Sequence, residues 1–430
     1  MITGTLLAVL VVLMALRFPV SIAIGIAAVV ALLMADLPLD VLPRMMVDSV
    51  DSYALLAVPF FVLAGNLMNA TGITERIFDF ARALFGVMRG GLAQVNVAAS
   101  MIFAGMSGAA LADLGGLGAV EMRAMRQNDY PADFSAAVTL ASCTIGPIIP
   151  PSIVLVVFGL ATDTSVGRLF LGGIVPGVII GLVTMAFISF YVRYNRTSWG
   201  QAEPFRFTEF WRTFRRGALA LVSPVIIIGA IIGGISTPSE VGAIAAAYAL
   251  VVGIVYRELT WERLRVCLIE SVTMTAVIMY LVAVSSVMGW VITTERVAHD
   301  AAQLIATHIQ NPLLGLLMIN VFLLFVGMFL ETLPALLIMS SILLPVVKVL
   351  GVDTVHFGII MCFNLIIGII TPPMGIGLFV AARVARISPE QVLRSVLPFM
   401  VPLLVGLLVI TAFPQLTLWL PNLVFGKIPG

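Results

Sequence analysis

The stretch TIGPIIPPSIVLVVFG, residues 144–159, lies in a strongly apolar part of the chain, where a membrane helix is expected. Three prolines within residues 147–151, preceded by Gly146, prevent that helix from being continuous. An unpaired backbone group costs several kcal/mol in hydrocarbon, so a broken helix persists in a bilayer only where protein or a water-filled cavity covers the break. The stretch therefore predicts backbone groups that are exposed to a solute rather than to lipid.

Composition indicates the class of protein around this stretch. The chain has 430 residues, of which 61% are hydrophobic and 10% charged, and its mean hydropathy is +1.13. Apolar runs of roughly 17 to 25 residues recur, the length that crosses hydrocarbon as a helix. A β-barrel is excluded, because barrel strands alternate apolar and polar residues. We expect an all-α polytopic membrane protein, with full spans near 2–16, 18–34, 55–70, 134–162, 168–192, 218–234, 239–256, 268–292, 354–382 and 396–413.

The basic residues predict the orientation of these spans. Two further apolar pairs, 91–126 and 312–349, are expected to enter and leave the membrane on one side. On that assumption 18 of the 23 basic residues fall on one side, and the other side holds Arg44, Arg168, Arg296, Lys348 and Lys427. Cytoplasmic loops carry the excess of Lys and Arg. Both termini are therefore predicted to be periplasmic, with a first span that is retained rather than cleaved.

A shift of 222 residues superimposes two parts of the chain. FAGM at 103–106 falls on FVGM at 325–328, and IGPIIPP at 145–151 falls on IGIITPP at 367–373. In the predicted topology the two copies have opposite orientations. Inverted repeats with discontinuous helices are typical of secondary transporters, whose substrate and ion sites lie between the repeats near the midplane. The break at the diproline is thus interpreted as a place where backbone groups meet a cargo.

Each predicted copy contains an amphipathic arm, a hairpin and a broken span. The arms begin at TERI, 74–77, and TERV, 294–297, and the hairpin tips are GMSGAALAD, 105–113, and GMFLETLPA, 327–335. Hairpins that enter from opposite faces would meet at the membrane centre beside the two breaks. Broken helix N-termini present N–H groups to anions there, and C-terminal ends present carbonyls to cations.

Hard oxygen ligands at these tips and breaks suit sodium. The candidates are carbonyls near Gly105, Gly146, Gly327 and Gly368 and the hydroxyls of Ser107, Thr144 and Thr371. Asp113 and Glu331 could add a carboxylate, and the alternative is that both acids lie in solvated turns. Intramembrane acids are costly, which favours a functional placement for Glu331, beside a long apolar run.

Other polar residues have simpler alternatives. Asn66, Asn96, Asn320 and Asn364 interrupt apolar stretches, where an interhelical hydrogen bond is the alternative to a ligand role. Glu240 and Glu270 lie near span ends and are interpreted as interfacial acids. Cys143, Cys267 and Cys362 are isolated, which predicts buried thiols. The basic and aromatic stretch FRFTEFWRTFRR, 205–216, fits the lipid headgroup region better than a nucleic-acid site.

Missing motifs narrow the source of energy. The sequence has no GxxxxGK[ST] phosphate loop and no HExxH, and its histidines, His299, His308 and His356, have no partners at metal-ligand spacing. These observations argue against direct ATP hydrolysis, zinc catalysis and an organic cofactor. We therefore expect an ion gradient or a partner protein to drive the process.

The combination of FAGMSGAALAD, GPIIPPSI and IITPPMGIGLF resembles the large membrane subunit, DctM or M, of tripartite ATP-independent periplasmic (TRAP) transporters, over essentially the whole chain. The resemblance implies an elevator-type member of the ion transporter superfamily with a scaffold and two re-entrant hairpins. It further implies sodium-coupled uptake in the bacterial inner membrane, a small four-helix (Q-type) membrane partner and a periplasmic binding protein. Substrates of the family are mostly carboxylates, such as C4-dicarboxylates, sialic acid and other sugar acids.

Carried over to this sequence, the resemblance implies two sodium sites. The first comprises Gly105, Ser107, Gly108, Thr144, Gly146, Pro147 and Pro150, and the second comprises Gly327, Glu331, Thr332, Gly368, Thr371 and Pro372. Candidate substrate contacts are Ser107, Asp113, Ser152, Asn66, Asn364 and Gly375. No arginine occurs in the central motifs, so a substrate carboxylate would rely on N–H groups, hydroxyls, sodium or an arginine from a loop.

Five segments are expected. They are scaffold spans and first arm at 1–90, the first hairpin and broken helix at 91–163, central scaffold and second arm at 164–311, the second hairpin and broken helix at 312–385, and a C-terminal span at 386–430. Sodium-coupled carboxylate import is the leading functional interpretation. The alternatives are an autonomous symporter or anion exporter of the same superfamily, and a passive channel.

Overall fold

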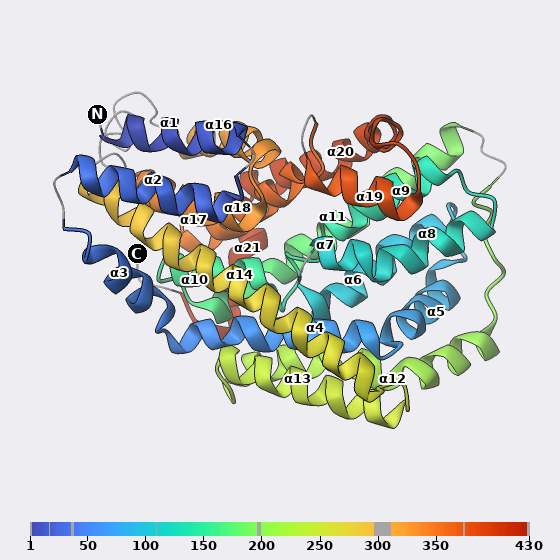
Figure 1. The fold of residues 1–430 in the computed structure, drawn as a ribbon. Coiled ribbons are helices and arrows are strands. Elements are labelled where there is room, and N and C mark those ends of the chain that lie inside the picture. Colours follow the sequence, from blue (N-terminus) through green and yellow to red (C-terminus); the bar gives the residue numbers. More distant parts are fainter. Residues whose placement is uncertain are drawn as a thin grey trace.

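The computed structural model describes residues 2–16, 18–35, 38–108, 110–195, 199–295, 311–372 and 375–427. Throughout these ranges the regular structure is helical (Figure 1). The N-terminal helices are α1 (Ile2–Ala15), α2 (Val20–Met34), α3 (Val41–Val50), the 3₁₀ helix η1 (Tyr53–Leu56), α4 (Ala57–Ala70) and α5 (Ile73–Phe85). The central helices are α11 (Val166–Tyr194), α12 (Phe207–Ile232), α13 (Pro238–Val255) and α14 (Trp261–Thr294), and the C-terminal ones are α20 (Pro389–Ala412) and α21 (Gln415–Phe425).

Two hairpins followed by broken helices lie between these elements. Unit 1 consists of α6 (Leu92–Ser107), α7 (Ala110–Gly115), α8 (Leu117–Gln127), α9 (Ala132–Cys143) and α10 (Ile153–Ala161). Unit 2 consists of α16 (Pro312–Phe329), α17 (Thr332–Val349), α18 (Thr354–Gly368) and α19 (Ile376–Ala385). The apolar pairs of the sequence are thus helical hairpins, and both diproline stretches interrupt a helix as predicted.

The membrane spans agree with the sequence prediction at 55–70, 168–192, 218–234, 239–256, 268–292 and 396–413. The predicted spans 2–16 and 18–34 are helices of only 14 and 15 residues, and both helices of the second apolar pair, 312–349, are themselves long enough to cross. Eight helices of the described ranges are long and apolar enough to cross a bilayer, namely Tyr53–Ala70, α11, α12, α13, α14, α16, α17 and α20. The broken helices α9, α10, α18 and α19 are each too short to span alone, which is the consequence of the proline and glycine breaks. Within the basic and aromatic stretch 205–216, residues from Phe207 onward form the first turns of α12.

Helix starts follow local capping chemistry. The Thr237 hydroxyl accepts from the Glu240 N–H, and the Glu240 carboxylate accepts from the Thr237 N–H at 2.7 Å, so the predicted interfacial acid closes a capping box at α13. Ser388 and Gln391 form the same motif at α20. Two helices, α3 and α21, were missed by the sequence analysis. Each has only 10 or 11 residues, below the length of a span.

The internal repeat is present in the structure. Adding 222 to the bounds of α9 gives 354–365, against 354–368 for α18, and adding it to α10 gives 375–383, against 376–385 for α19. The packing repeats as well. Helix α10 packs against α17 and α19 packs against α7 and α8, so the second half of each broken helix contacts the hairpin of the other unit. The helix that follows each unit in the chain also contacts the other unit. Helix α11, after unit 1, packs on α18 of unit 2, and α20, after unit 2, packs on α9 of unit 1.

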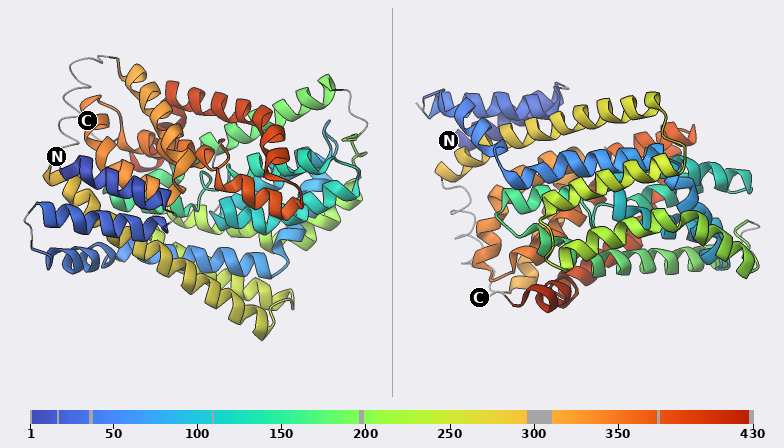
Figure 2. Two further views of the ribbon diagram at one scale, coloured as in Figure 1. Left: turned by 45° about the horizontal axis from the view of Figure 1, so that its top comes forward. Right: turned by 90° about the horizontal axis from the view of Figure 1, so that it is seen from below.

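The two hairpins lie at opposite ends of the molecule. In Figure 1, α8 lies on the right with α5 and α12, whereas α17 lies on the left with α2 and α3. The two further views keep this separation (Figure 2). Both chain ends are marked on the left in these views. The second predicted arm, which begins at TERV 294–297, lies mostly outside the described residues.

Glycines bring the backbones of unit 2 into contact. A Cβ at Gly368 of α18 would lie 2.6 Å from the Cα and carbonyl carbon of Gly327 in α16. A Cβ at Gly327 would lie 3.1 Å from the Gly368 Cα. Such contacts cannot be relieved by a rotamer change, because the neighbouring atoms are backbone. The pair therefore fixes the distance between hairpin 2 and its broken helix.

We predict that Gly368→Ala lowers the stability of the protein, since overpacking of this kind costs about 1–3 kcal/mol. The matched control is Gly229→Ala in α12, where an added Cβ meets nothing within 4 Å. The measurement is the thermal unfolding midpoint of both variants in the same detergent. The midpoint should fall for Gly368→Ala only, and equal midpoints for the two variants would contradict the close crossing.

Candidate functional site

The tip of hairpin 1 lies directly on the break of unit 1. Gly108 ends α6 with a left-handed backbone, φ +67°. A Cβ at this position would meet the Pro151 carbonyl oxygen and would lie 3.1 Å from the Ser152 Cα. At Gly105, one turn earlier, a Cβ would lie 2.9 Å from Pro224 of α12 and 3.7 Å from the Pro150 carbonyl oxygen. Two carbonyl oxygens of the break therefore lie next to the end of α6.

Hydroxyl groups hold the break of unit 1 in shape. Ser152 caps α10, where its Oγ accepts from the Leu155 N–H at 3.2 Å and donates to the Pro147 carbonyl. Thr144 caps the end of α9 and donates to the Ala141 carbonyl at 2.7 Å. Both side chains are fully buried. The Ser152 hydroxyl is thus engaged in capping, and its predicted contact with substrate would require this arrangement to open.

Asp113 joins hairpin 1 to the same break. Its side chain is only 3% exposed, so the interpretation as a solvated turn residue is wrong. Its Oδ2 lies 2.7 Å from the place where Gly146 would carry a Cβ. A side chain at Gly146 would displace the carboxylate, which explains the glycine here. The carbonyls, hydroxyls and carboxylate of unit 1 together form a set of hard oxygen donors.

The break of unit 2 is partly described. Thr371 donates to the Ile367 carbonyl at 2.7 Å, and a Cβ at Gly375 would lie 2.9 Å from the Thr371 carbonyl oxygen. Pro372 lies between them, whereas Pro373 and Met374 are outside the described residues. On the hairpin side, Glu331 is the exposed N-cap residue of α17 and Thr332 is buried. The side chain of Ser107 in unit 1 also lies outside the described part.

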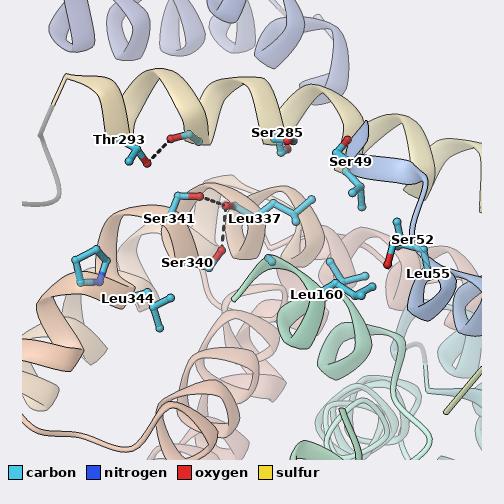
Figure 3. Close-up of a pocket in the computed structure, with 16 residues that line it drawn as sticks. Ser49, Ser52, Leu55, Leu160, Ser285, Thr293, Leu337, Ser340, Ser341 and Leu344 are labelled. Atoms are coloured by element: carbon cyan, nitrogen blue, oxygen red, sulfur yellow. Dashed lines mark hydrogen bonds between the residues drawn. The ribbon is translucent and has the colours of Figure 1, made fainter. Parts of the chain in front are cut away.

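A cleft lined by hydroxyl groups lies at the left end of the molecule. We call it the hydroxyl cleft; it has a volume of about 520 Å³, and its walls are α3 and η1, α10, α14 and α17 (Figure 3). Its polar lining consists of Ser49, Ser52, Ser285, Ser286, Thr293, Ser340 and Ser341, and none of the described lining residues is charged. The walls come from both units and from the helices outside them. The volume is within the usual range for a small-molecule pocket.

The sequence analysis missed this cleft, although two serine pairs signal it. Ser285 and Ser286 interrupt an apolar run of α14, and Ser340 and Ser341 interrupt one of α17. Ser340 and Ser341 both donate to the Leu337 carbonyl, at 3.1 and 3.2 Å, so their lone pairs remain available to a ligand. The Ser285 hydroxyl has no hydrogen-bond partner among the described residues.

A second cleft lies at the opposite end, between α4, α5, hairpin 1 and the start of α14. We call it the acidic cleft; it has a volume of about 950 Å³ and is lined by Asn66, Asn69, Glu75, Glu258, Glu262, Arg263 and Glu270, among others. Ala112, Gly115 and Gly116 of hairpin 1 also line it. Asn66 faces this cleft and also donates to the Ser271 hydroxyl at 2.9 Å, so both of its predicted roles are compatible with the structure.

The remaining asparagines make interhelical hydrogen bonds. Asn364 donates to the Asn320 carbonyl and side-chain oxygen, each at 3.0 Å, and Asn320 donates to Thr411 at 2.9 Å. Asn96 donates to Thr139 at 2.6 Å. Asn364 is fully buried and lines neither cleft. Its predicted substrate contact therefore has no cleft to support it, and the structural alternative explains the residue.

Metal chemistry other than that of sodium finds no support in the described ranges. They contain no group of three or more His, Cys, Asp or Glu side chains that could hold a metal ion. The three cysteines are free and buried, as predicted. His356 pairs with Thr417 at 2.8 Å. Oxygen donors at the two breaks suit a hard monovalent cation better than a transition metal.

Two hairpins, two broken helices and clefts at both ends define a multi-pass membrane transporter. The family model described as "Tripartite ATP-independent periplasmic transporter, DctM component" matches residues 7–416. The chain belongs to this DctM family, so it is a transporter subunit and not an enzyme, and it is a multi-pass protein of the bacterial inner membrane.

Individual relatives support the same assignment. The chain is 44% identical to the sialic acid TRAP transporter large permease protein SiaM of Vibrio cholerae, over 89% of this chain and 90% of that protein. It is 38% identical to the C4-dicarboxylate TRAP transporter large permease protein DctM of Pseudomonas aeruginosa, over 87% and 88% of the two chains. The crystal structure of the YdaH transporter of Alcanivorax borkumensis shares the fold, with a TM-score of 0.63 at 14% identity, over 89% of this chain and 88% of that chain.

We predict that Ser285→Ala weakens the apparent affinity for substrate, because a neutral hydrogen bond contributes about 0.5–1.5 kcal/mol, or roughly two- to tenfold. The measurement is the substrate concentration for half-maximal uptake by reconstituted protein. Thr273→Ala is the control, since this exposed hydroxyl of the same helix bonds only the Ile269 carbonyl. A Ser285→Ala variant with wild-type affinity would remove the hydroxyl cleft from the substrate path.

Proposed function

We propose that the chain is the large membrane subunit of a sodium-driven importer of a hydroxylated organic acid. The observation that carries the proposal is the contact between hairpin 1 and the break of unit 1, where carbonyl oxygens, Asp113 and Gly146 lie side by side. Buried oxygen donors of this kind suit a cation that has lost its water. We propose the two sodium sites with the residues that the family resemblance implies.

The substrate class follows from the clefts. Seven hydroxyl side chains, and no charged one among the described residues, line the hydroxyl cleft, which suits a ligand with several hydroxyl groups. A sugar acid such as sialic acid has that chemistry, and the V. cholerae relative is named for sialic acid. The P. aeruginosa relative is named for C4-dicarboxylates. A C4-dicarboxylate has fewer polar groups that could bond the hydroxyl side chains of the cleft. Sialic acid or another sugar acid is therefore the first substrate to test.

Movement of the two units against the remaining helices would give alternating access. The hydroxyl cleft and the acidic cleft lie at opposite ends. The walls of the hydroxyl cleft come from both units and from helices outside them, and those of the acidic cleft come from unit 1 and from helices outside it. Helix α5 is held outside unit 1 by Arg76–Glu258 and Arg82–Glu203 ion pairs, both 2.7 Å long. Between α5 and α6 the chain passes through Gly90 and Gly91, whose φ angles are +102° and +45°. This junction is suited to act as the hinge of an elevator motion.

The orientation and the partners complete the proposal. The end with the acidic cleft faces the cytoplasm, as the arginine distribution predicts, and both termini face the periplasm. Hairpins that enter from the two faces then reach the membrane centre as re-entrant loops. A small four-helix membrane subunit and a periplasmic binding protein that delivers the substrate are the proposed partners, in keeping with the tripartite family.

The decisive experiment is uptake of labelled sialic acid into proteoliposomes, with and without a sodium gradient, the small subunit and the binding protein. We expect accumulation only when all components and an inward sodium gradient are present. Accumulation without a binding protein would favour an autonomous symporter. Flux that never exceeds the external concentration would indicate a passive channel, and accumulation independent of sodium would refute the coupling.

We predict that Thr371→Val raises the sodium concentration for half-maximal uptake by about two- to tenfold, the effect of losing one hydroxyl ligand. Thr371→Ser retains the hydroxyl and should restore the wild-type value. The readout is a sodium titration of initial uptake at saturating substrate. If Thr371→Val and wild type have the same titration, the hydroxyl is not part of the second sodium site.

A further inference from the structure

A buried carboxyl group lies inside hairpin 1, apart from the predicted sodium sites. Glu121 belongs to α8 and is 0% exposed. None of the ion pairs among the described residues includes it. Its Oε2 has no hydrogen-bond partner there, and its Oε1 lies 3.5 Å from the Ser100 hydroxyl of α6. A carboxylate with so few partners would cost several kcal/mol as an anion.

The repeat indicates that the fold does not require this acid. Adding 222 to Glu121 gives Leu343 of α17, which is also buried. Hairpin 2 therefore packs an apolar side chain at the equivalent place. Hairpin 1 carries a second buried acid, Asp113, where hairpin 2 has Ala335. Unit 1 has thus gained two ionisable groups that unit 2 does without.

The hydroxyl hydrogens near Glu121 indicate that its carboxyl group is protonated. Ser100 has one hydroxyl hydrogen, and Ser142 is its nearer acceptor, at 3.1 Å. Ser142 in turn donates to the Asn96 side-chain oxygen at 2.6 Å, and the Asn96 amide donates to Thr139 at 2.6 Å. The hydroxyl hydrogens of Ser100 and Ser142 are then both used. The contact between Ser100 and Glu121 is favourable only if Glu121 supplies the hydrogen.

The surroundings leave a proton as the fitting cation. Helices α8 and α9 approach closely beside Glu121, since a Cβ at Gly118 would lie 2.8 Å from the Thr139 methyl group. A proton needs no coordination sphere, whereas a sodium ion needs several oxygen ligands around it. The titratable group whose charge acts on Glu121 is Asp113 of α7, which supplies no positive charge.

Basic groups of the other neighbouring helices are occupied or face outward. Helices α5 and α19 also pack against α8. Both arginines of α5 are in ion pairs, Arg76 with Glu258 and Arg82 with Glu203. The acids of α5, Glu75 and Asp79, are exposed, and so is Arg383 of α19. On α8 itself, Arg126 donates to the Ala385 carbonyl at 3.3 Å and Arg123 is exposed. No neighbouring cation among the described residues thus neutralises Glu121.

We propose that Glu121 is a proton-binding site inside hairpin 1, at which the neutral acid donates into the chain Ser100, Ser142, Asn96 and Thr139. The bound proton removes one negative charge from a unit that must move within the membrane. The site is separate from the proposed sodium ligands, and the proposal does not depend on which substrate is transported. Its ligand is a proton from water, so no further reactant is required.

The test is infrared difference spectroscopy of the full chain, which detects the carbonyl band of a protonated carboxylic acid. At neutral pH the wild type should show this band, and Glu121→Gln should lose the intensity of one carboxylic acid. Asp113→Asn, the matched buried acid of the same hairpin, should keep the band of Glu121. Addition of sodium should leave the band unchanged, because the proton is not exchanged for the metal.

Three results would overturn the proposal. They are no difference between wild type and Glu121→Gln, a band that disappears in Asp113→Asn instead, and a band that sodium abolishes, which would make Glu121 a sodium ligand. If the glutamine variant does not fold, the measurement is repeated on Glu121→Leu, which copies the side chain of hairpin 2.

Transport gives an independent readout. Uptake by Glu121→Gln should stay within about twofold of wild-type uptake, because the amide is neutral like the acid. A loss of tenfold or more would contradict the neutral state.

Discussion

The structure depends on how the backbone groups freed by two breaks are satisfied. Proline and glycine end α9 and α18 in the interior of the bundle, where unpaired N–H and C=O groups cannot be left to hydrocarbon. In unit 1 the break is covered by the tip of hairpin 1, with Gly108 against the Pro151 carbonyl. In unit 2 the Gly327–Gly368 crossing holds the hairpin against α18. In unit 1 the contacts that cover the break also bring together the oxygen donors of the proposed cation site.

The two units share one architecture and differ in chemistry. Their helix bounds repeat at 222 residues, and each broken helix packs on the hairpin of the other unit. Unit 1 carries the buried acids Asp113 and Glu121, whereas unit 2 has Ala335 and Leu343 at those positions. The common architecture supplies broken helix ends, and the two buried acids give unit 1 ionisable groups that unit 2 lacks at the equivalent positions. Chemical asymmetry therefore arises within a repeated fold.

Sequence patterns predicted the fold well because apolar length and the Gly–Pro breaks are local signals. They failed where function depends on which helices pack together. The serine pairs at 285 and 340 are 55 positions apart, and only the packing of α14 on α17 makes them one cleft. Glu121 lies in GAVEMRAMR, whose arginines are typical of an exposed helix, so nothing local marks its burial. Asp113 could not be placed for the same reason. The serines of the cleft could have been noticed as polar pairs in apolar runs.

The central claim is that two antiparallel units meet at the membrane centre with both broken helices open toward solute. Electron cryo-microscopy of the protein in a lipid nanodisc with sodium tests it most directly. The account predicts interruptions at 144–152 and 369–375, hairpin tips that enter from opposite faces, and sodium density beside the first break. Continuous helices through both diprolines, or two tips that enter from the same face, would contradict it.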